Sequence, residues 1–223
     1  MFLRKVPRFL KFLVCASLLA GGVAVAEEPA EIVAWGDSLT QGTGGNGDSW
    51  PAWFTRLSDG IPVINKGVGG QTSTQIKERM LAGKDMHGKF TVIWAGRNNA
   101  FDQKGTVQAD IAAMVAALDA PNYLIVGNPN GAKEPKDGPD RWKLTLIDKL
   151  NASLKETYGA RFVDVRPILV EAYDSSQPQD VKDHADNVVP SSLRSDALHL
   201  NRAGYKIVAR AILDAYLANP PKQ

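Results

Sequence analysis

Cysteine and histidine are scarce in this sequence, and their scarcity excludes two kinds of site. The only cysteine, Cys15, lies in an apolar run near the N-terminus, so the chain that follows cannot form an internal disulfide. The three histidines show no H-x-x-x-H spacing and have no cysteine beside them. We therefore predict no metal site.

Clusters of lysine and arginine are also absent after the first 26 residues, which argues against nucleic acid as a partner. No G-K-[ST] sequence ends the glycine-rich stretch at residues 42–47, so a P-loop is excluded. What is present is ordinary: 44% of the 223 residues are hydrophobic and 22% are charged. This composition and length are typical of one globular domain with a single core.

The first 26 residues have the layout of a cleaved secretory signal peptide. Four basic residues precede an uncharged, mostly apolar run over 12–26, which ends in the small-residue sequence AVA. That run is shorter than the roughly 20 residues that a transmembrane helix needs. We expect a signal peptide at 1–26, a domain at 27–223, export to a periplasm or beyond, and no stable membrane anchor after cleavage.

Removal of this segment also changes the charge of the protein. The segment carries four positive charges and no negative one, so the formal net charge falls from +2 to −2. The basic character of the full chain therefore belongs mostly to the expected signal peptide.

Short apolar runs alternate with helical patterns after residue 27. The apolar runs predict buried parallel strands at 32–35, 62–65, 90–95, 123–126 and 162–165. Apolar residues at three- and four-residue spacing predict helices at 50–57, 74–81, 107–118, 141–158 and 202–217. The alternation predicts an α/β sandwich with a parallel sheet, and such sheets bind ligands at the carboxyl ends of their strands. Two irregular stretches, 128–140 and 175–194, are expected to border that site.

A serine directly follows the first predicted strand, in the tetrapeptide GDSL at residues 36–39. A sharp turn there would expose the Ser38 hydroxyl at the carboxyl edge of the sheet. Serine at the end of a strand is also a common helix cap or turn former. The interpretation of Ser38 as a nucleophile therefore depends on a base elsewhere in the chain.

An aspartate and a histidine three residues apart, Asp196 and His199, fit that requirement. A turn or short helix would bring the two side chains to one side. The Asp196 carboxylate would then hold the Nδ1 proton of His199 and aim Nε2 at Ser38, as in a hydrolytic triad. The alternative is a surface aspartate beside an unrelated loop histidine.

Two other strand ends offer donors for a developing oxyanion. The glycine-rich loop at 65–72 presents a backbone N–H at Gly70, and the loop at 96–99 presents the side-chain amide of Asn98. Each loop taken alone is also explained by turn chemistry.

These four segments, in this order, resemble the conserved blocks of the SGNH hydrolases, the GDSL-type esterases and lipases. The resemblance implies Ser38 as nucleophile, and Asp196 and His199 as the orienting acid and the base. It implies that the Ser38 N–H, Gly70 and Asn98 bind the oxyanion. It further implies a three-layer α/β/α sandwich with a parallel, flavodoxin-like sheet of about five strands, and no metal or organic cofactor.

The sequence departs from the family pattern at one position, where Asn99 stands in place of the usual aspartate. The change keeps a hydrogen-bonding group but removes a charge. The loop at 96–99, after the third predicted strand, must therefore be held without a charge at this position.

The resulting expectation is an exported serine ester hydrolase that acts on a small-molecule or glycan ester with a short acyl group such as acetyl. A lipase or thioesterase is an alternative that uses the same residues. A non-catalytic carbohydrate-binding relative is another, and Asn99 is the only feature that favours it.

A nucleotide-binding protein is a third alternative, because residues 42–47 match G-x-G-x-x-G. The match begins well beyond the strand end at Gly36, and the second predicted strand ends without an acidic residue for a ribose. The glycines fit better as a rim beside the nucleophile.

Just after these glycines, Trp50 and Trp53 either pack a helix on the sheet or form an aromatic wall for an acyl chain or a sugar ring.

Overall fold

The fold was analysed in a computed structural model, which describes residues 31–99, 101 and 104–221. The predicted signal peptide at 1–26 lies outside these residues. Among the described residues, no helix combines the length and the apolar character needed to cross a membrane.

The centre of the molecule is a sheet of five parallel strands in the order β2-β1-β3-β4-β5. This is the flavodoxin-like order, with the first strand flanked by the second and the third. The strands are β1 (Ile32–Gly36), β2 (Val63–Gly67), β3 (Phe90–Trp94), β4 (Tyr123–Val126) and β5 (Phe162–Val163). The prediction of a parallel sheet of about five strands is confirmed.

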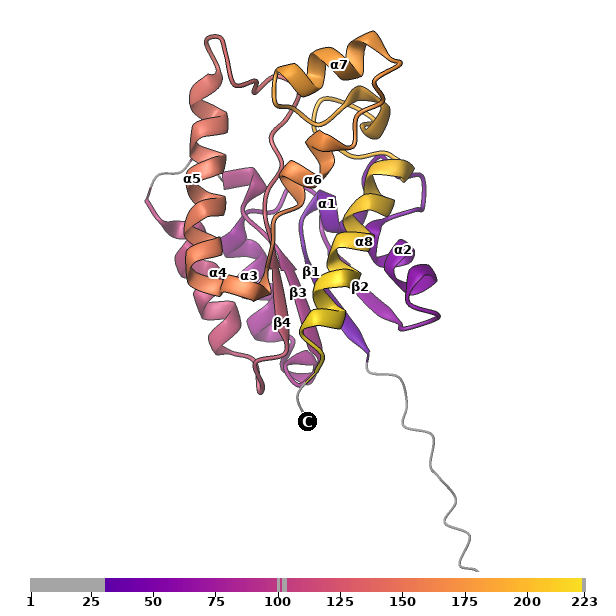
Figure 1. The fold of residues 1–223 in the computed structure, drawn as a ribbon. Coiled ribbons are helices and arrows are strands. Elements are labelled where there is room, and N and C mark those ends of the chain that lie inside the picture. The colour runs from indigo at the N-terminus through magenta and orange to yellow at the C-terminus, as the bar shows by residue number, and fades with distance from the viewer. Residues whose placement is uncertain (1–30, 100, 102–103, 222–223) are drawn as a thin grey trace, which may run out of the picture.

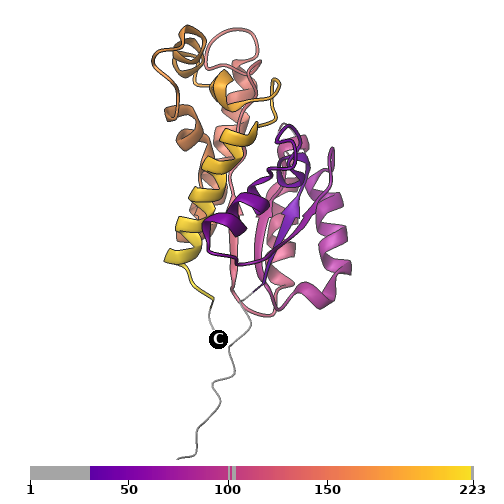
Figure 2. The ribbon, with the colours of Figure 1, turned by 90° about the vertical axis from the view of Figure 1, so that its right-hand side faces the viewer.

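Helices cover both faces of this sheet and complete three layers (Figures 1 and 2). The helices are α1 (Ser38–Gln41), α2 (Trp50–Leu57), α3 (Ser73–Ala82), α4 (Thr106–Ala116), α5 (Arg141–Tyr158), α6 (Val165–Glu171), α7 (Pro178–Ala185) and α8 (Arg202–Ala218). Helices α2, α6 and α8 pack on one face, and α3, α4 and α5 pack on the other. The three-layer α/β/α prediction is confirmed.

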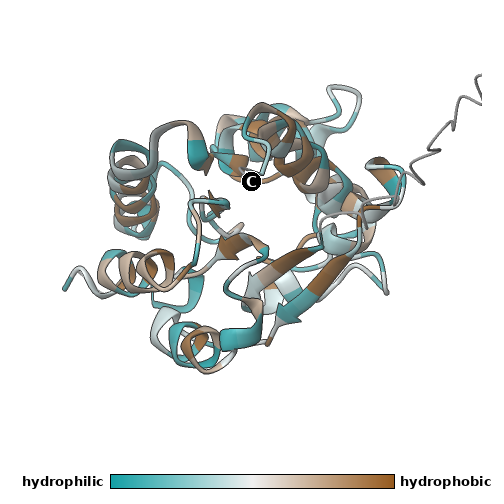
Figure 3. Ribbon diagram, turned by 90° about the horizontal axis from the view of Figure 1, so that it is seen from below, coloured by the Kyte–Doolittle hydropathy of each residue, from teal (hydrophilic) through white to brown (hydrophobic). Residues whose placement is uncertain are grey.

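Two apolar cores lie between these layers, because side chains of a strand alternate between the faces of a sheet. In β1, Ile32 and Ala34 enter the core under α2 and α8, whereas Val33 and Trp35 enter the core under α3 and α4. All four are buried. Figure 3, which views the molecule from below, shows hydrophobic residues along most of the strands, with helices on both sides of the sheet.

The structure corrects three predictions, and the ends of several other elements differ from the predicted ones by one or two residues. Strand β2 runs two residues further than 62–65, to Gly67, because Lys66 and Gly67 continue the parallel pairing with β1. Strand β5 has only two residues, and Val165 begins helix α6 instead of ending the strand. The stretch 175–194, expected to be irregular, contains helix α7, which a buried polar network described below holds in place.

All segments singled out for chemistry lie at one end of the sheet. In Figure 1 the short helix α1, which follows β1 directly, lies at the upper end of the sheet, the same end as α7. This end collects the carboxyl ends of the parallel strands, which is where α/β proteins build their sites.

Candidate active site

The nucleophile candidate stands on a tight turn between β1 and α1. Asp37 caps the helix, accepting a hydrogen bond from the Leu39 N–H at 2.9 Å, and Ser38 is the first helical residue. Gly36 is required at the end of the strand, because a Cβ there would lie 2.6 Å from the Trp94 carbonyl oxygen. The Ser38 side chain is consequently held at the carboxyl edge of the sheet and remains 9% exposed.

Asp37 itself is a buried carboxyl beside this turn. Burial raises the pKa of Asp37 to about 6, against the opposing effects of the Leu39 N–H and of the charges of Arg97 and His199. Its second oxygen accepts a hydrogen bond from Asn98 Nδ2 at 3.3 Å. Asp37 therefore links the turn that carries Ser38 to the loop that carries Asn98.

The structure brings Ser38, His199 and Asp196 together, although 161 residues separate Ser38 from His199. His199 Nε2 lies 3.0 Å from Ser38 Oγ, and His199 Nδ1 lies 2.7 Å from Asp196 Oδ2. The turn predicted from the three-residue spacing forms because Asp196 Oδ1 accepts the backbone N–H groups of Leu198 and His199, both at 2.7 Å. These distances allow a proton to pass from the hydroxyl to the imidazole.

The Asp196 carboxylate is placed to stabilise a positive charge on the His199 ring. Partial burial raises the pKa of Asp196, but the hydrogen bonds from the Leu198 N–H and from His199 outweigh it and lower the pKa to about 2. The carboxylate is therefore ionised throughout the neutral range and faces the Nδ1 side of the ring. An imidazolium formed at His199 would be stabilised there.

The predicted oxyanion donors lie in two loops that touch each other. Asn98, in the short 3₁₀ turn Arg97–Asn99 after β3, is exposed and donates from Nδ2 to the Gln71 carbonyl at 2.8 Å. Gly70 directly precedes Gln71, and a Cβ on Gly70 would meet nothing within 4 Å, so its backbone borders open space. The neighbouring Gly69 comes close to Ser38, since a Cβ there would lie 3.8 Å from Ser38 Cβ.

The unusual Asn99 holds the third loop without a charge of its own. Its Oδ1 accepts the Ser73 N–H at 3.2 Å, and its Nδ2 donates to Ser73 Oγ at 3.0 Å. Ser73 Oγ donates in turn to Asp110, a buried carboxylate that also pairs with Lys77 at 2.6 Å. The negative charge absent from position 99 is thus present one hydrogen bond further away, on α4.

The glycines of the G-x-G-x-x-G match have packing roles. Gly42 ends α1 in the left-handed conformation, and its N–H bonds to the Ser38 carbonyl. At Gly44 a Cβ would lie 2.0 Å from Ser195 Oγ and 2.7 Å from the Leu200 carbonyl oxygen. The loop therefore packs on the segment that carries His199, as the interpretation of the glycines as a rim predicts, and it does not lead from a strand end into a phosphate-binding helix.

The stretch 128–140 borders the site as predicted. Ala132 N–H donates to the Ala197 carbonyl at 2.6 Å, which ties this stretch to the turn between Asp196 and His199. A buried ion pair joins it to the loop that carries Asn98, because Arg97 Nη2 contacts both carboxylate oxygens of Glu134 at 2.8 and 2.9 Å. Sequence patterns carried no sign of this pair, whose members lie 37 residues apart.

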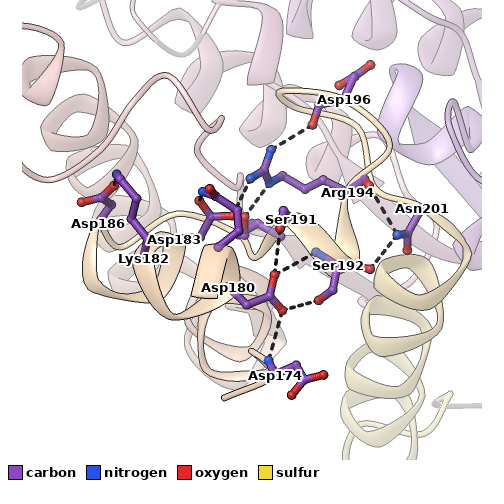
Figure 4. A network of polar contacts seen from close by, with 12 residues as sticks. Asp174, Asp180, Lys182, Asp183, Asp186, Ser191, Ser192, Arg194, Asp196 and Asn201 are labelled. Carbon is purple, nitrogen blue, oxygen red and sulfur yellow. Dashed lines mark hydrogen bonds and ion pairs between the residues drawn. The ribbon is translucent and has the colours of Figure 1, made fainter. Parts of the chain in front are cut away.

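A second polar network fixes the other side of the His199 turn (Figure 4). Arg194 donates to the Asp196 carbonyl at 3.2 Å and forms a buried ion pair with Asp183 of α7 at 2.7 Å. Asp180, fully buried on the same helix, accepts from Ser191 Oγ and from both the N–H and the Oγ of Ser192. Helix α7 thereby anchors the segment that leads into Asp196.

Asp180 is expected to stabilise the fold through its buried hydrogen bonds. Burial raises the pKa of Asp180, but the Ser192 and Ser191 hydrogen bonds outweigh it and lower the pKa to about 2. We expect Asp180→Asn to reduce the free energy of unfolding by about 3 kcal/mol at pH 7, because the amide NH₂ would face groups that donate. Urea unfolding of both proteins measures the difference.

The pH dependence of that difference is a further check. The folded pKa is lower than the unfolded value of about 4, so the unfolded chain binds more protons between pH 4 and 2. The contribution of Asp180 is complete above about pH 4 and is lost as the pH falls, so the difference between the two proteins should shrink at pH 3. Asp174→Asn, which removes an exposed carboxylate of the same network, should change stability little. Equal losses in both variants would contradict the role of Asp180.

The two tryptophans after the glycine loop differ in their environments. Trp50 is fully buried in the core between the sheet and the helices, so the aromatic-wall alternative is wrong for this residue. Trp53 is partly exposed and lines a hollow beside α8.

Among the described residues, no group of three or more histidine, cysteine, aspartate or glutamate side chains is arranged to hold a metal ion.

Comparison with known proteins places this geometry in a family. The model of the GDSL-like lipase/acylhydrolase family matches residues 34–207, which include the end of β1, Ser38, the loops that carry Gly70 and Asn98, and the Asp196–His199 turn. The chain belongs to the GDSL-like lipase/acylhydrolase family. The predicted resemblance to SGNH hydrolases is thereby confirmed, and the chain is an esterase- or lipase-type hydrolase.

Members of this GDSL-like family differ widely in sequence from the chain. The platelet-activating factor acetylhydrolase IB subunit alpha1 of Rattus norvegicus is 28% identical over 193 residues, which cover 83% of this chain and 74% of that protein. A lipase/acylhydrolase from Enterococcus faecalis has a similar solved structure, with a TM-score of 0.62, 18% identity, and coverage of 86% of this chain and 98% of that one. A variant of an acetyl xylan esterase from Geobacillus stearothermophilus has a TM-score of 0.60 at 21% identity, covering 83% and 94%.

Proposed function

We propose that this GDSL-like hydrolase is a serine esterase in which Ser38, His199 and Asp196 form the catalytic triad. The observation that carries the proposal is the pair of contacts along the triad, 3.0 Å from Ser38 Oγ to His199 Nε2 and 2.7 Å from His199 Nδ1 to Asp196 Oδ2. Nucleophile, base and orienting carboxylate lie within hydrogen-bond reach in the required order.

The mechanism follows from these positions. His199 Nε2 takes the Ser38 proton as Oγ attacks the ester carbonyl carbon, and the carbonyl oxygen becomes an oxyanion. Nε2 then gives the proton to the leaving alcohol, which leaves an acyl group on Ser38. Water attacks that acyl-enzyme by the same proton transfers in reverse, releasing the acid and restoring the hydroxyl.

The oxyanion is held by three N–H donors in this proposal: the Ser38 N–H, the Gly70 N–H and Asn98 Nδ2. The two Nδ2 hydrogens of Asn98 point to the Gln71 carbonyl at 2.8 Å and to Asp37 at 3.3 Å. The longer bond is the weaker one, so the hydrogen that it uses is the one that would bond to the oxyanion. The bond to Gln71 would keep the amide in place.

The proposed substrate is a short acyl ester, most simply an acetyl ester carried by a carbohydrate. Names of the similar proteins support this choice, because the rat relative is an acetylhydrolase and the Geobacillus neighbour is a variant of an acetyl xylan esterase.

We further propose that the chain is exported to a periplasm or beyond after loss of residues 1–26, works without nucleic-acid partners, and keeps no stable membrane anchor. The non-catalytic alternative loses its basis, since Asn99 holds its loop by two hydrogen bonds.

A panel of esters tests the substrate class. With p-nitrophenyl acetate, butyrate and octanoate, kcat/KM should be highest for acetate and should fall by at least about tenfold by octanoate, because a site shaped for a short acyl group cannot accommodate extra methylenes. Acetate release from acetylated xylo-oligosaccharides should proceed as well. A kcat/KM that rises with chain length would favour the lipase alternative and overturn the proposed acyl specificity.

A further inference from the structure

Three cationic side chains surround Trp53 at the N-terminal end of α8. The guanidinium carbons of Arg56 and Arg202 lie 4.8 and 5.4 Å from the centre of the Trp53 ring, and Lys206 Nζ lies 5.2 Å from it. Trp53, Arg202 and Lys206 line a hollow of about 490 Å³, together with the glycine loop at Gly44 and Asn46. These three cations lie over the Trp53 ring, so the hollow presents positive charge beside an aromatic side chain, which suits a negatively charged ligand.

Only part of this positive charge is neutralised within the protein. Asp48 pairs with Arg56 and with Arg202, so these two guanidinium groups share one carboxylate. Lys206 is exposed and has no carboxylate partner among the described residues. The hollow consequently keeps an uncompensated cation, in a chain whose net charge after residue 26 is −2.

The basic surface continues along α8. Arg202, Lys206 and Arg210 follow one another at intervals of four residues, so they share one face of the helix with a rise of about 6 Å between neighbours. Lys206 also lines a second hollow of about 320 Å³, between α8 and the exposed Ile168 of α6. Figure 1 shows α8 running between α6 and α2, so the two hollows flank one helix and meet at Lys206.

This face adjoins the active-site end of the protein. Arg202 follows His199 by three residues in the chain. Tyr205, which directly precedes Lys206, donates a hydrogen bond from its hydroxyl to the Thr43 carbonyl at 2.8 Å and so ties α8 to the glycine loop. The loop that packs on the His199 segment at Gly44 also forms the wall of the hollow. A chain-like ligand bound along α8 would therefore run toward the end of the sheet where Ser38 lies.

We propose that this face of α8 is a binding subsite for acidic carbohydrate, in which uronate carboxylates of the sugar chain pair with Lys206 and Arg210 beside Trp53. The inference rests on the proposed carbohydrate esterase function and adds that the ester-bearing glycan contains uronic acid units. Carbohydrate is favoured over a single small anion because the cations form a row beside an aromatic ring and are not gathered at one point.

Calorimetric titration with hexagalacturonate, which carries no ester, tests the subsite separately from catalysis. We expect the wild-type protein to bind it, Lys206→Gln to weaken binding about fivefold, and the double variant Lys206→Gln/Arg210→Gln to weaken it by more than about twentyfold. Neutral xylohexaose should bind more weakly, with an affinity that Lys206→Gln does not change. Added salt should weaken hexagalacturonate binding, because the pairs are exposed.

Lys149→Gln is the matched control, since Lys149 is an exposed lysine in the middle of α5, which covers the opposite face of the sheet. Hydrolysis of p-nitrophenyl acetate should be unchanged in Lys206→Gln, so loss of sugar binding with intact hydrolysis supports the subsite. Absence of hexagalacturonate binding, an equal effect of Lys149→Gln, or equally tight binding of inorganic phosphate would each overturn it. If no ester were hydrolysed, the esterase proposal would be overturned instead. The titration measures binding of an ester-free sugar, so its result is separate from that outcome.

Discussion

Replacing Ser38 with alanine is expected to reduce kcat/KM for p-nitrophenyl acetate by about 10⁴- to 10⁶-fold, the largest effect of any single change in this chain. In the proposed mechanism this hydroxyl forms the acyl bond, and among the described residues it is the one hydroxyl in hydrogen-bond contact with the His199 ring, at 3.0 Å. Steady-state hydrolysis followed by p-nitrophenolate release measures the effect, and mass spectrometry would detect an acyl group on Ser38 in the wild type only.

The double variant Ser38→Ala/His199→Ala is the sharper control for this prediction. Residues that act as one unit lose their function together, so the double variant should be no slower than Ser38→Ala alone. Removal of the hydroxyl deletes a small, nearly buried group, and the thermal unfolding midpoint should change little. Activity retained within tenfold of the wild type in Ser38→Ala would disprove the proposed nucleophile.

Asn98→Ala should lower kcat by about 100- to 1,000-fold with a smaller change in KM, because the Nδ2 donor is needed most when negative charge develops on the carbonyl oxygen. The donor comes from an exposed side chain whose amide is already oriented by the Gln71 carbonyl. Such preorganisation makes the donor effective, since the amide stays bonded to Gln71 and only its longer contact with Asp37 is exchanged when the oxyanion forms. Separate determination of kcat and KM on the acetate ester tests this.

Asn99→Ala is the control for damage to the same loop. Its amide hydrogen bonds to Ser73 Oγ and to no group of the triad, so we expect a loss of stability with a decrease in kcat of no more than about tenfold. If both asparagine variants reduced kcat equally, the effect of Asn98 would be structural, and the third oxyanion donor would have to be another group.

The boundaries of the secondary structure show where sequence patterns were sufficient. Helices α2 and α5 begin and end at the predicted residues, 50–57 and 141–158, because their apolar spacing and their flanking residues are local features. Helix α3 begins at Ser73, one residue before the predicted start, because the side chains of Thr72 and Gln75 form reciprocal hydrogen bonds that cap it. Local patterns of this kind can be recognised in the sequence before the fold is known.

Helix α7 shows the opposite case. Its sequence, PQDVKDHA, is polar and has one large apolar residue, Val181, which remains exposed, so no apolar stripe indicated a helix. What stabilises the helix is distant in the chain: Asp180 accepts hydrogen bonds from Ser191 and Ser192, and Asp183 pairs with Arg194. Contacts between polar groups have no periodicity that a sequence reveals.

The sequence by itself indicated an acyl hydrolase and a parallel α/β sheet, because strand ends, turns and apolar periodicity are local and the residue types in four short segments suit acyl transfer. Only the tertiary structure decided that Trp50 is core and Trp53 borders a cationic hollow, that Asp110 supplies the charge absent at Asn99, and that Arg97 pairs with Glu134. These outcomes depend on which distant side chains share a buried volume, where an unpaired polar group is costly. That pairing is a property of the packed chain, and residue spacing does not encode it.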